Sequence, residues 1–199
     1  MHGPRWVHVL ALALAVVLVA AWQPVSNDDE ITVRRINVVD EAGQVRLVIS
    51  GDLPDPIARG QQVERSISPA GILWFDEDGN ESGGLVTAPT GGGGKQRGII
   101  FDFTHQPTDA VSVGTIESGD GEVWMAGLMV HDRLPYEPGE IGTSQGKRRI
   151  LLGTQNQDAG LVILDPQERE RIRIGVGPDG TAGIEILNEE GEIVYRAPE

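Results

Sequence analysis

One short pattern recurs along the chain and constrains its fold more than any other feature. The pattern is a small or polar residue, an aliphatic residue, a free position, two apolar residues and then Asp or Asn at the start of a four-residue turn. Four segments carry it: RINVVDEAGQV from Arg35, GILWFDEDGNE from Gly71, GLVILDPQERE from Gly160 and GIEILNEEGEI from Gly183. GIIFDFTHQP from Gly98 is a weaker fifth copy. A second strand-like segment follows the turns, so each copy predicts a β-hairpin.

The turn residues of these copies support the hairpins. Asp40, Asp76 and Asn188 each begin a turn that ends in glycine. Asp and Asn side chains hydrogen-bond to the backbone of their own turn, and glycine takes a positive φ without steric cost. In the copy at residue 160 a proline also favours a turn, but Glu168 replaces the glycine, so we expect a different closure there.

The rest of the chain also predicts short strands. We expect strands over residues 123–130 and 149–154, and no segment after residue 30 has the 3.6-residue apolar period of a helix. We therefore predict an all-β fold of antiparallel β-hairpin repeats, as a sandwich or an irregular stack of hairpins. A β-solenoid or a propeller-like fold is the alternative, ranked lower because the copies are unevenly spaced. Residues 51–70 and 87–97 interrupt the hairpins as long loops, which are either functional or disordered.

The N-terminus predicts export. A basic residue precedes an apolar run over residues 6–22, and the first acidic residues follow soon after it. Such a run is a transmembrane anchor or a cleaved signal peptide, and the tryptophans at its ends favour the anchor. We divide the chain into this helix at 1–22, a tether at 23–30 and an exported all-β domain at 31–199. The domain is placed outside the cytoplasm, single-pass at the cell membrane or periplasmic or extracellular after cleavage.

The charge of the exported part limits its partners. It carries 15 basic and 30 acidic residues, which gives a formal charge of −15. Such a surface repels phosphate backbones and anionic lipid heads, so we expect no nucleic acid, and membrane contact only through residues 6–22. The chain has no cysteine, which excludes disulfides, thiolate chemistry and cysteine-ligated zinc.

Two sets of residues resemble metal ligands. Asp76, Asp78 and Asn80 alternate as at the start of a calcium loop, but Glu81 and Thr87 occupy the positions where such a loop needs glycine and glutamate. We therefore interpret the three as turn residues.

Histidines and aspartates form the second set. His105 and His131 could join Asp102 and Asp132, but their spacing is not that of a ligand pair. We expect ordinary polar residues at strand ends, and we assign no metal and no cofactor.

Two further motifs suggest catalysis or phosphate binding. Residues 142–146 match the G-x-S-x-G motif around Ser144, but prolines precede it and a strand follows, where the motif needs a strand before and a helix after. Gly91 to Lys95 lack the remaining residues of a phosphate loop. We interpret both as loops and assign no catalytic residue.

The aromatic residues lie within apolar strands. They are Trp74, Phe75, Phe101, Phe103 and Trp124. We expect them to pack in the core rather than to form a sugar-binding platform.

Residues 31–86 carry a resemblance. RINVVDEAGQVRLVIS, a proline-containing connection and AGILWFDEDGNESGGLV together resemble a family of uncharacterised bacterial proteins with a single N-terminal hydrophobic segment and an exported domain of β-hairpin repeats. The resemblance implies a bacterial envelope location and carries over no catalytic residue.

These observations favour a membrane-anchored or secreted β-domain that acts as a structural or binding module in the cell envelope, with a protein or glycan partner. One alternative is a serine hydrolase that uses Ser144 with His105 or His131 on an envelope substrate. The other is a module that binds a cation or a glycan.

Overall fold

The computed structural model describes residues 30–65, 67–103, 108–133 and 146–198. The chain divides into two compact units, Met1–Val33 and Arg34–Glu199. The predicted helix at 1–22 and most of the tether lie outside the described residues. Within the described part of the chain, no helix is long and apolar enough to cross a membrane.

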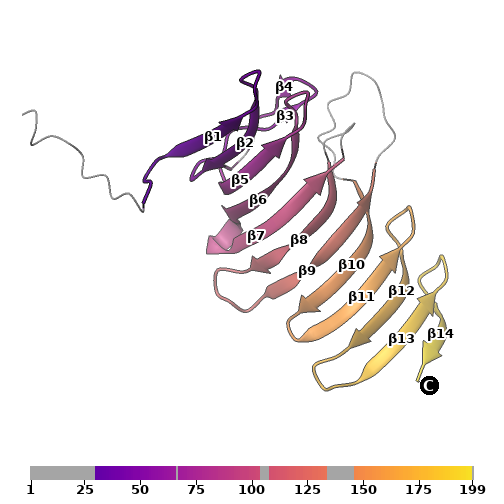
Figure 1. Cartoon of the computed structure of the whole chain (residues 1–199). Coiled ribbons are helices and arrows are strands. Elements are labelled where there is room, and N and C mark those ends of the chain that lie inside the picture. Colours follow the sequence, from indigo (N-terminus) through magenta and orange to yellow (C-terminus); the bar gives the residue numbers. More distant parts are fainter. Residues whose placement is uncertain (1–29, 66, 104–107, 134–145, 199) are drawn as a thin grey trace, which may run out of the picture. The chain divides into compact units, whose positions relative to one another are not determined.

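Twelve strands of the second unit form one open, antiparallel sheet (Figure 1). They are β1 (Arg35–Val39), β2 (Val45–Ser50), β5 (Ala70–Phe75), β6 (Glu81–Pro89), β7 (Lys95–Asp102), β8 (Asp109–Glu117), β9 (Trp124–Asp132), β10 (Lys147–Gln155), β11 (Asp158–Leu164), β12 (Glu170–Val176), β13 (Ala182–Leu187) and β14 (Ile193–Ala197). Their order in the sheet follows their order in the chain. The two short strands β3 (Ile57–Ala58) and β4 (Gln61–Gln62) pair separately, and the 3₁₀ turn η1 (Gly91–Gly93) joins β6 to β7.

The all-β prediction is confirmed, and so are the antiparallel hairpins. The hairpins are not arranged as the predicted sandwich. Each hairpin continues the edge of the previous one, so the twelve long strands make one sheet and not a two-layered sandwich. The connections explain this, because most are short turns that return the chain to the adjacent edge and leave no crossover to a second layer.

The predicted turn caps are confirmed. In four hairpins, one side-chain oxygen of the first turn residue accepts hydrogen bonds from the backbone N–H groups two and four residues later. These first residues are Asp40, Asp76, Asp165 and Asn188. We call the end of the sheet where these turns lie the capped end.

The expectation for Glu168 is wrong. Its φ is 62°, close to the 83° of Gly43, and the turn closes with the same backbone hydrogen bond. A left-handed conformation costs a non-glycine residue about 1–2 kcal/mol. The Glu168 carboxylate accepts hydrogen bonds from the backbone N–H and the guanidinium of Arg148 and lies 3.6 Å from Lys147. These contacts offset the strain.

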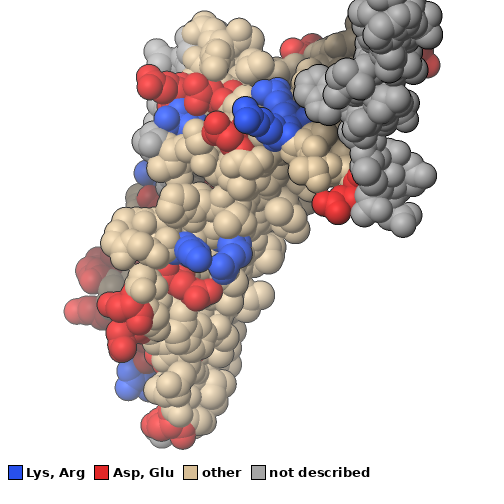
Figure 2. All heavy atoms as spheres, turned by 90° about the vertical axis from the view of Figure 1, so that its left-hand side faces the viewer, with Lys and Arg blue, Asp and Glu red and all other residues tan. Residues whose placement is uncertain are grey.

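The sheet has two different faces because side chains alternate along each strand. On one face, here the apolar face, an aliphatic row runs through direct cross-strand partners. The row is Ile36, Ile49, Ile72, Leu85, Ile99, Val113, Leu128, Leu152, Leu161, Ile174 and Ile184. The opposite face is here the grooved face. On the side shown in Figure 2, charged side chains gather in separate groups with wide uncharged areas between them.

The well-packed core is local. Leu53, from the connection between β2 and β5, is buried on the grooved face against Val48, Leu73 and Phe75. The loop predicted at 51–70 therefore has a structural role as the cover of β2 and β5. The loop predicted at 87–97 is shorter than expected, because β6 and β7 extend into it.

Candidate functional site

A row of glycines crosses the grooved face. The glycine row is Gly98, Gly114, Gly127, Gly153, Gly160, Gly175 and Gly183, which are direct cross-strand partners from β7 to β13. A Cβ atom on Gly153 would lie 2.2 Å from the carbonyl oxygen of Ala126, and one on Gly114 would lie 2.3 Å from that of Arg97. The central strands thus approach each other too closely for any other residue.

The glycine row forms the floor of a groove of about 850 Å³. One side is lined by Ile100, Ser112, Met129, Leu151 and Val162, and the other by Gln96, Ile116, Met125, Gln155 and Asp158. No described aromatic residue lines it. The groove therefore offers glycine backbone flanked by both apolar and polar side chains.

Asp102 and His131 lie on the grooved face near the capped end, at the fifth position of the repeated pattern. In other copies this position holds Val39, Phe75, Leu164 or Leu187. The last three are only 8%, 5% and 3% exposed, so the fold uses the position for buried apolar side chains. In β7 and β9 the same position holds ionisable groups. Only these two hairpins have expanded connections at the capped end, over residues 103–108 and 133–146.

Asp102 faces other acidic groups. Its cross-strand partner is Asp109 on β8. Burial, and then the nearby carboxylates of Asp109 and Glu81, raise the pKa of Asp102 to about 7. Burial also raises the pKa of Asp109, while His131 acts to lower it. Neither aspartate forms a salt bridge with any described residue, so this pair is the uncompensated charge of the site.

Glu81 is the compensated member of the group. Arg65 donates from one guanidinium nitrogen to both of its carboxylate oxygens, at 2.7 Å each. Burial still raises the pKa of Glu81, although Arg65 opposes this. Arg65 also acts to lower the pKa of Asp102 but does not outweigh burial.

His131 is the buried polar residue of the site. It is 8% exposed, and its Nδ1 atom has no hydrogen-bond partner among the described residues. The hydroxyl oxygen of Ser112, on the groove wall, is likewise buried and unpartnered within the described part. Buried polar atoms are normally hydrogen-bonded, so these two atoms are exceptions within the described part of the chain.

Arg148 is the cross-strand partner of His131 and extends the polar row to β10. Its guanidinium is held by Glu168. The pKa of Glu168 is lowered by hydrogen bonds from the side chain and backbone of Arg148. We define the polar row as Asp102, Asp109, His131, Arg148 and Glu168. Three of its members line the groove: Asp109, Arg148 and Glu168.

The residues that resembled metal ligands are not assembled into a set of three among the described residues. His105 lies outside the described residues, and Asp132 forms an ion pair with Arg149. Asp76 caps its turn, and Asn80 donates to Asp76 and accepts from the N–H of Gly60. Among the described residues, no group of three or more His, Cys, Asp or Glu could hold a metal ion.

Most of the G-x-S-x-G motif lies outside the described residues, and the glycine-rich segment is a turn. Ser144 lies outside the described residues, and no described contact favours the hydrolase hypothesis. Gly91 to Lys95 make the turn between β6 and β7, where the N–H of Thr90 donates to the carbonyl of Gly94.

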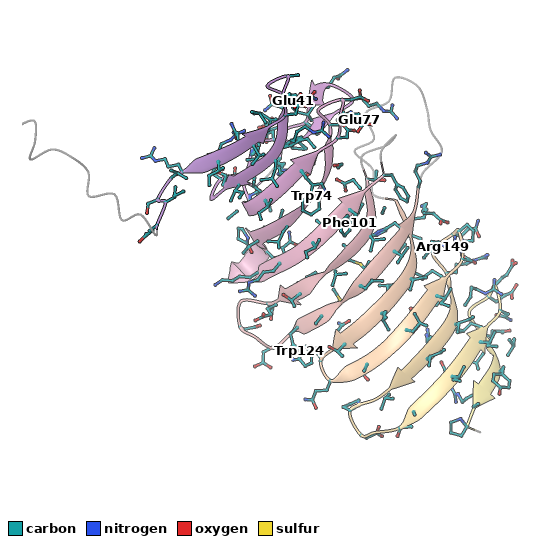
Figure 3. The ribbon with its side chains drawn as sticks, viewed as in Figure 1. Glu41, Trp74, Glu77, Phe101, Trp124 and Arg149 are labelled. Atoms are coloured by element: carbon teal, nitrogen blue, oxygen red, sulfur yellow. The ribbon has the colours of Figure 1, made fainter. Side chains whose placement is uncertain are left out.

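The aromatic residues are on the apolar face, with the exception of Phe75 and the strand-end residue Phe103. The ring centroids of Trp74 and Phe101 lie 5.7 Å apart, and both residues are cross-strand partners of Gly83. Figure 3 labels the two side chains. Core packing is correct for Phe75 and wrong for Phe101, which is 53% exposed. The difference arises because no described element covers this part of the apolar face.

A sixth copy of the pattern lies in β9, beyond the five identified from the sequence. Gly127-Leu-Met-Val-His-Asp132 fits it, except that His131 replaces the second apolar residue. Aligning this segment with Gly71-Ile-Leu-Trp-Phe-Asp76 places His131 at the position of Phe75. That alignment could have identified His131 from the sequence as a polar residue at an apolar position.

No protein-family model matches the chain, and no curated protein shows significant sequence similarity to it. The function is therefore inferred from the geometry described above.

Proposed function

We propose that the chain is a non-enzymatic binding module of the bacterial cell envelope that captures a basic, extended polypeptide segment in the groove. In this proposal residues 6–22 hold the protein at the membrane and the sheet lies outside the cytoplasm. The segment lies along the glycine row, and a cationic side chain reaches the carboxylates of Asp102 and Asp109.

One observation carries the proposal. The fifth position of the pattern is a buried apolar residue in three copies and an ionisable residue in the two central ones. An ionisable group at such a position is unfavourable for folding unless it is paired. Asp102 and His131 therefore favour a role in binding, because they do not improve the packing of the sheet.

The charges of the site favour a cation. Asp102 and Asp109 have no described salt-bridge partner, whereas Arg148 and Glu168 neutralise each other. A guanidinium or ammonium group between the aspartates would oppose the burial that raises both pKa values and, for Asp102, the repulsion from the neighbouring carboxylates. Binding would displace a proton from Asp102, so affinity should increase as the pH rises through about 7.

The groove favours a polypeptide over a glycan. Its floor is half-buried glycine backbone that can hydrogen-bond to a peptide. Its walls carry aliphatic and methionine side chains, which adapt to irregular apolar ligands, beside polar groups such as Gln96 and Asp158. The tryptophans that could stack on a sugar lie on the opposite face. The acidic exported part disfavours nucleic acid.

The test is a peptide titration of the full chain in detergent, followed by the midpoint of thermal unfolding. The probe is a short peptide of alternating valine and serine with one terminal arginine. Its control replaces arginine with citrulline, which is neutral and has nearly the same shape. The arginine peptide should raise the midpoint, because a ligand that binds only the folded state stabilises it.

Two variants localise the binding. Asp102→Asn combined with Asp109→Asn should abolish the shift, while Asp78→Asn, on an exposed turn, should retain it. Equal shifts with arginine and citrulline, or an unchanged shift in the double variant, would refute the proposal.

A further inference from the structure

Two rows of apolar side chains span the apolar face. The first is the aliphatic row defined above. The second, which we call the aromatic–aliphatic row, is Val38, Leu47, Trp74, Gly83, Phe101, Val111, Val130, Ile150, Ile163, Ile172, Ile186 and Tyr195. Every member except Gly83 is a large apolar or aromatic side chain, and neither row contains a charge.

Many members of both rows are open to solvent. Val113 is 49% exposed, Leu152 is 52% exposed and Tyr195 is 53% exposed. Twelve strands spaced about 4.8 Å apart give a face about 50 Å long, and two rows of side chains make it about 15 Å wide. The resulting area of about 750 Å² exceeds the largest apolar patch of a typical monomer, about 300–600 Å².

We infer that the apolar face is covered by the apolar face of a second copy of this chain, which produces a two-layered β-sandwich between molecules. The area matches, because a stable interface buries about 800 Å² on each partner. Two antiparallel sheets of identical twist also pack face to face about 10 Å apart.

The charge distribution favours a second copy over a lipid surface. The exported part has a formal charge of −15, which repels anionic lipids. The acidic side chains of Asp102, Asp109 and Glu185 are on the grooved face, and the two apolar rows are neutral. Two copies can therefore meet through these rows without placing like charges opposite each other.

This pairing is independent of the proposed ligand site. It leaves both grooves on the outer faces of the sandwich, so each copy keeps its polar row accessible. Loss of the peptide site would not affect pairing, and loss of pairing would not remove the polar row.

The absence of native cysteine permits a direct test. Val113 is on β8, the sixth of the twelve strands, near the centre of the face. In a two-fold symmetric pair, residues near the axis face their own copies. The full chain with Val113→Cys, treated in membranes with a short bismaleimide, should give a product of twice the mass of the chain. The control is Ile116→Cys, which is 38% exposed on the same strand but on the grooved face. Its yield should be at least tenfold lower.

A second variant tests whether the contact is apolar. Leu128→Cys should cross-link like Val113→Cys, and adding Val113→Asp should reduce its yield at least tenfold. Val113 is half exposed, so the charge should leave the isolated sheet folded, which thermal unfolding will check. Three outcomes would overturn the inference. They are equal yields from Val113→Cys and Ile116→Cys, a Val113→Cys protein that cross-links only to other proteins or not at all, and a Leu128→Cys yield that is unchanged when Val113→Asp is added.

Discussion

The two central hairpins, β7–β8 and β9–β10, and the outer hairpins β11–β12 and β13–β14 share one backbone plan but differ at one position. At the capped end the outer hairpins close with tight turns over Leu164 and Leu187, which are buried. The central hairpins carry Asp102 and His131 at the same place, and their connections are longer. The repeats thus provide the sheet, and departures from the repeat provide the site.

The comparison also separates stability from binding. The outer copies use the fifth position to bury apolar surface, which stabilises the fold. The central copies bury polar atoms there with incomplete partners, which is unfavourable. Exchanging the two kinds of residue should therefore alter stability in opposite directions.

The largest effect is expected when a buried apolar residue at the fifth position is replaced by an aspartate, the residue that β7 carries there. Phe75→Asp should reduce the free energy of unfolding by more than about 4 kcal/mol, because it removes a buried ring and buries a charge without a designed partner. Urea denaturation of the full chain in detergent, followed by fluorescence, measures it. Phe75→Leu, which keeps the position apolar, should reduce it by about 1 kcal/mol. Similar losses in the two variants would contradict the comparison.

The second prediction contrasts two glycines of the glycine row. Gly153→Ala, in the centre, should destabilise the protein by about 2–3 kcal/mol, because its Cβ would lie 2.2 Å from the Ala126 carbonyl oxygen. Gly183→Ala, in an outer hairpin, meets nothing closer than 3.7 Å. It should stabilise the fold by about 0.5 kcal/mol, because alanine lowers the conformational entropy of the unfolded chain. The same urea midpoints measure both, and effects of equal sign would show that the central strands relax.

Much of this sheet was predictable from sequence. The turn residues and the alternation within the strands identified four hairpins, and Asp40, Asp76, Asp165 and Asn188 cap their turns in the structure. The single layer was not predictable. An apolar strand face requires a cover, but the pattern does not indicate whether that cover comes from the same chain or from another.

The site was only partly predictable. Asp102 and His131 were identified as candidates, but their sequence spacing gave no sign that they share one row of the grooved face. The long connection after β9 obscured the sixth copy, and His131 occupies a position where the pattern requires an apolar residue. The glycine row was also missed, because its register depends on the pairing of seven strands.

In the third prediction, Asp102 is replaced by the apolar residue that the outer hairpins carry at the same position. Asp102→Leu should stabilise the protein by about 2 kcal/mol at about pH 8, because it replaces a half-buried carboxylate that has no described salt-bridge partner with the kind of residue found at Leu164. It should also abolish the proposed binding of the arginine peptide. Urea denaturation and the peptide titration measure the two effects. A destabilised variant would mean that the carboxylate has a stabilising partner.

The smallest expected effect is a pH dependence that differs between the regions. In the folded protein the pKa of Asp102 is raised to about 7, compared with 3.8 for the unperturbed carboxyl group of the unfolded chain. The folded chain therefore binds this proton more tightly than the unfolded chain. The stability that it contributes is complete below about pH 3.8 and is lost as the pH rises through about 7. Between about pH 5.5 and 6.5 the free energy of unfolding should decrease by about 1 kcal/mol from this group.

The outer hairpins should respond in another pH range. Hydrogen bonds from Arg196, and then from Arg173, lower the pKa of Glu185 below its usual 4.5. Its contribution is present above that value and is lost only as the pH falls further, so above about pH 5 the free energy of unfolding changes with Asp102 and not with Glu185. Urea denaturation of the wild type and of Asp102→Asn across these ranges separates the contributions. His131, Asp109, Glu81 and Arg65 are present in both proteins, so the difference between the two slopes reports Asp102. Identical slopes above pH 5 would show that Asp102 ionises without a cost to the fold, and the contrast between central and outer hairpins would then lie in packing alone.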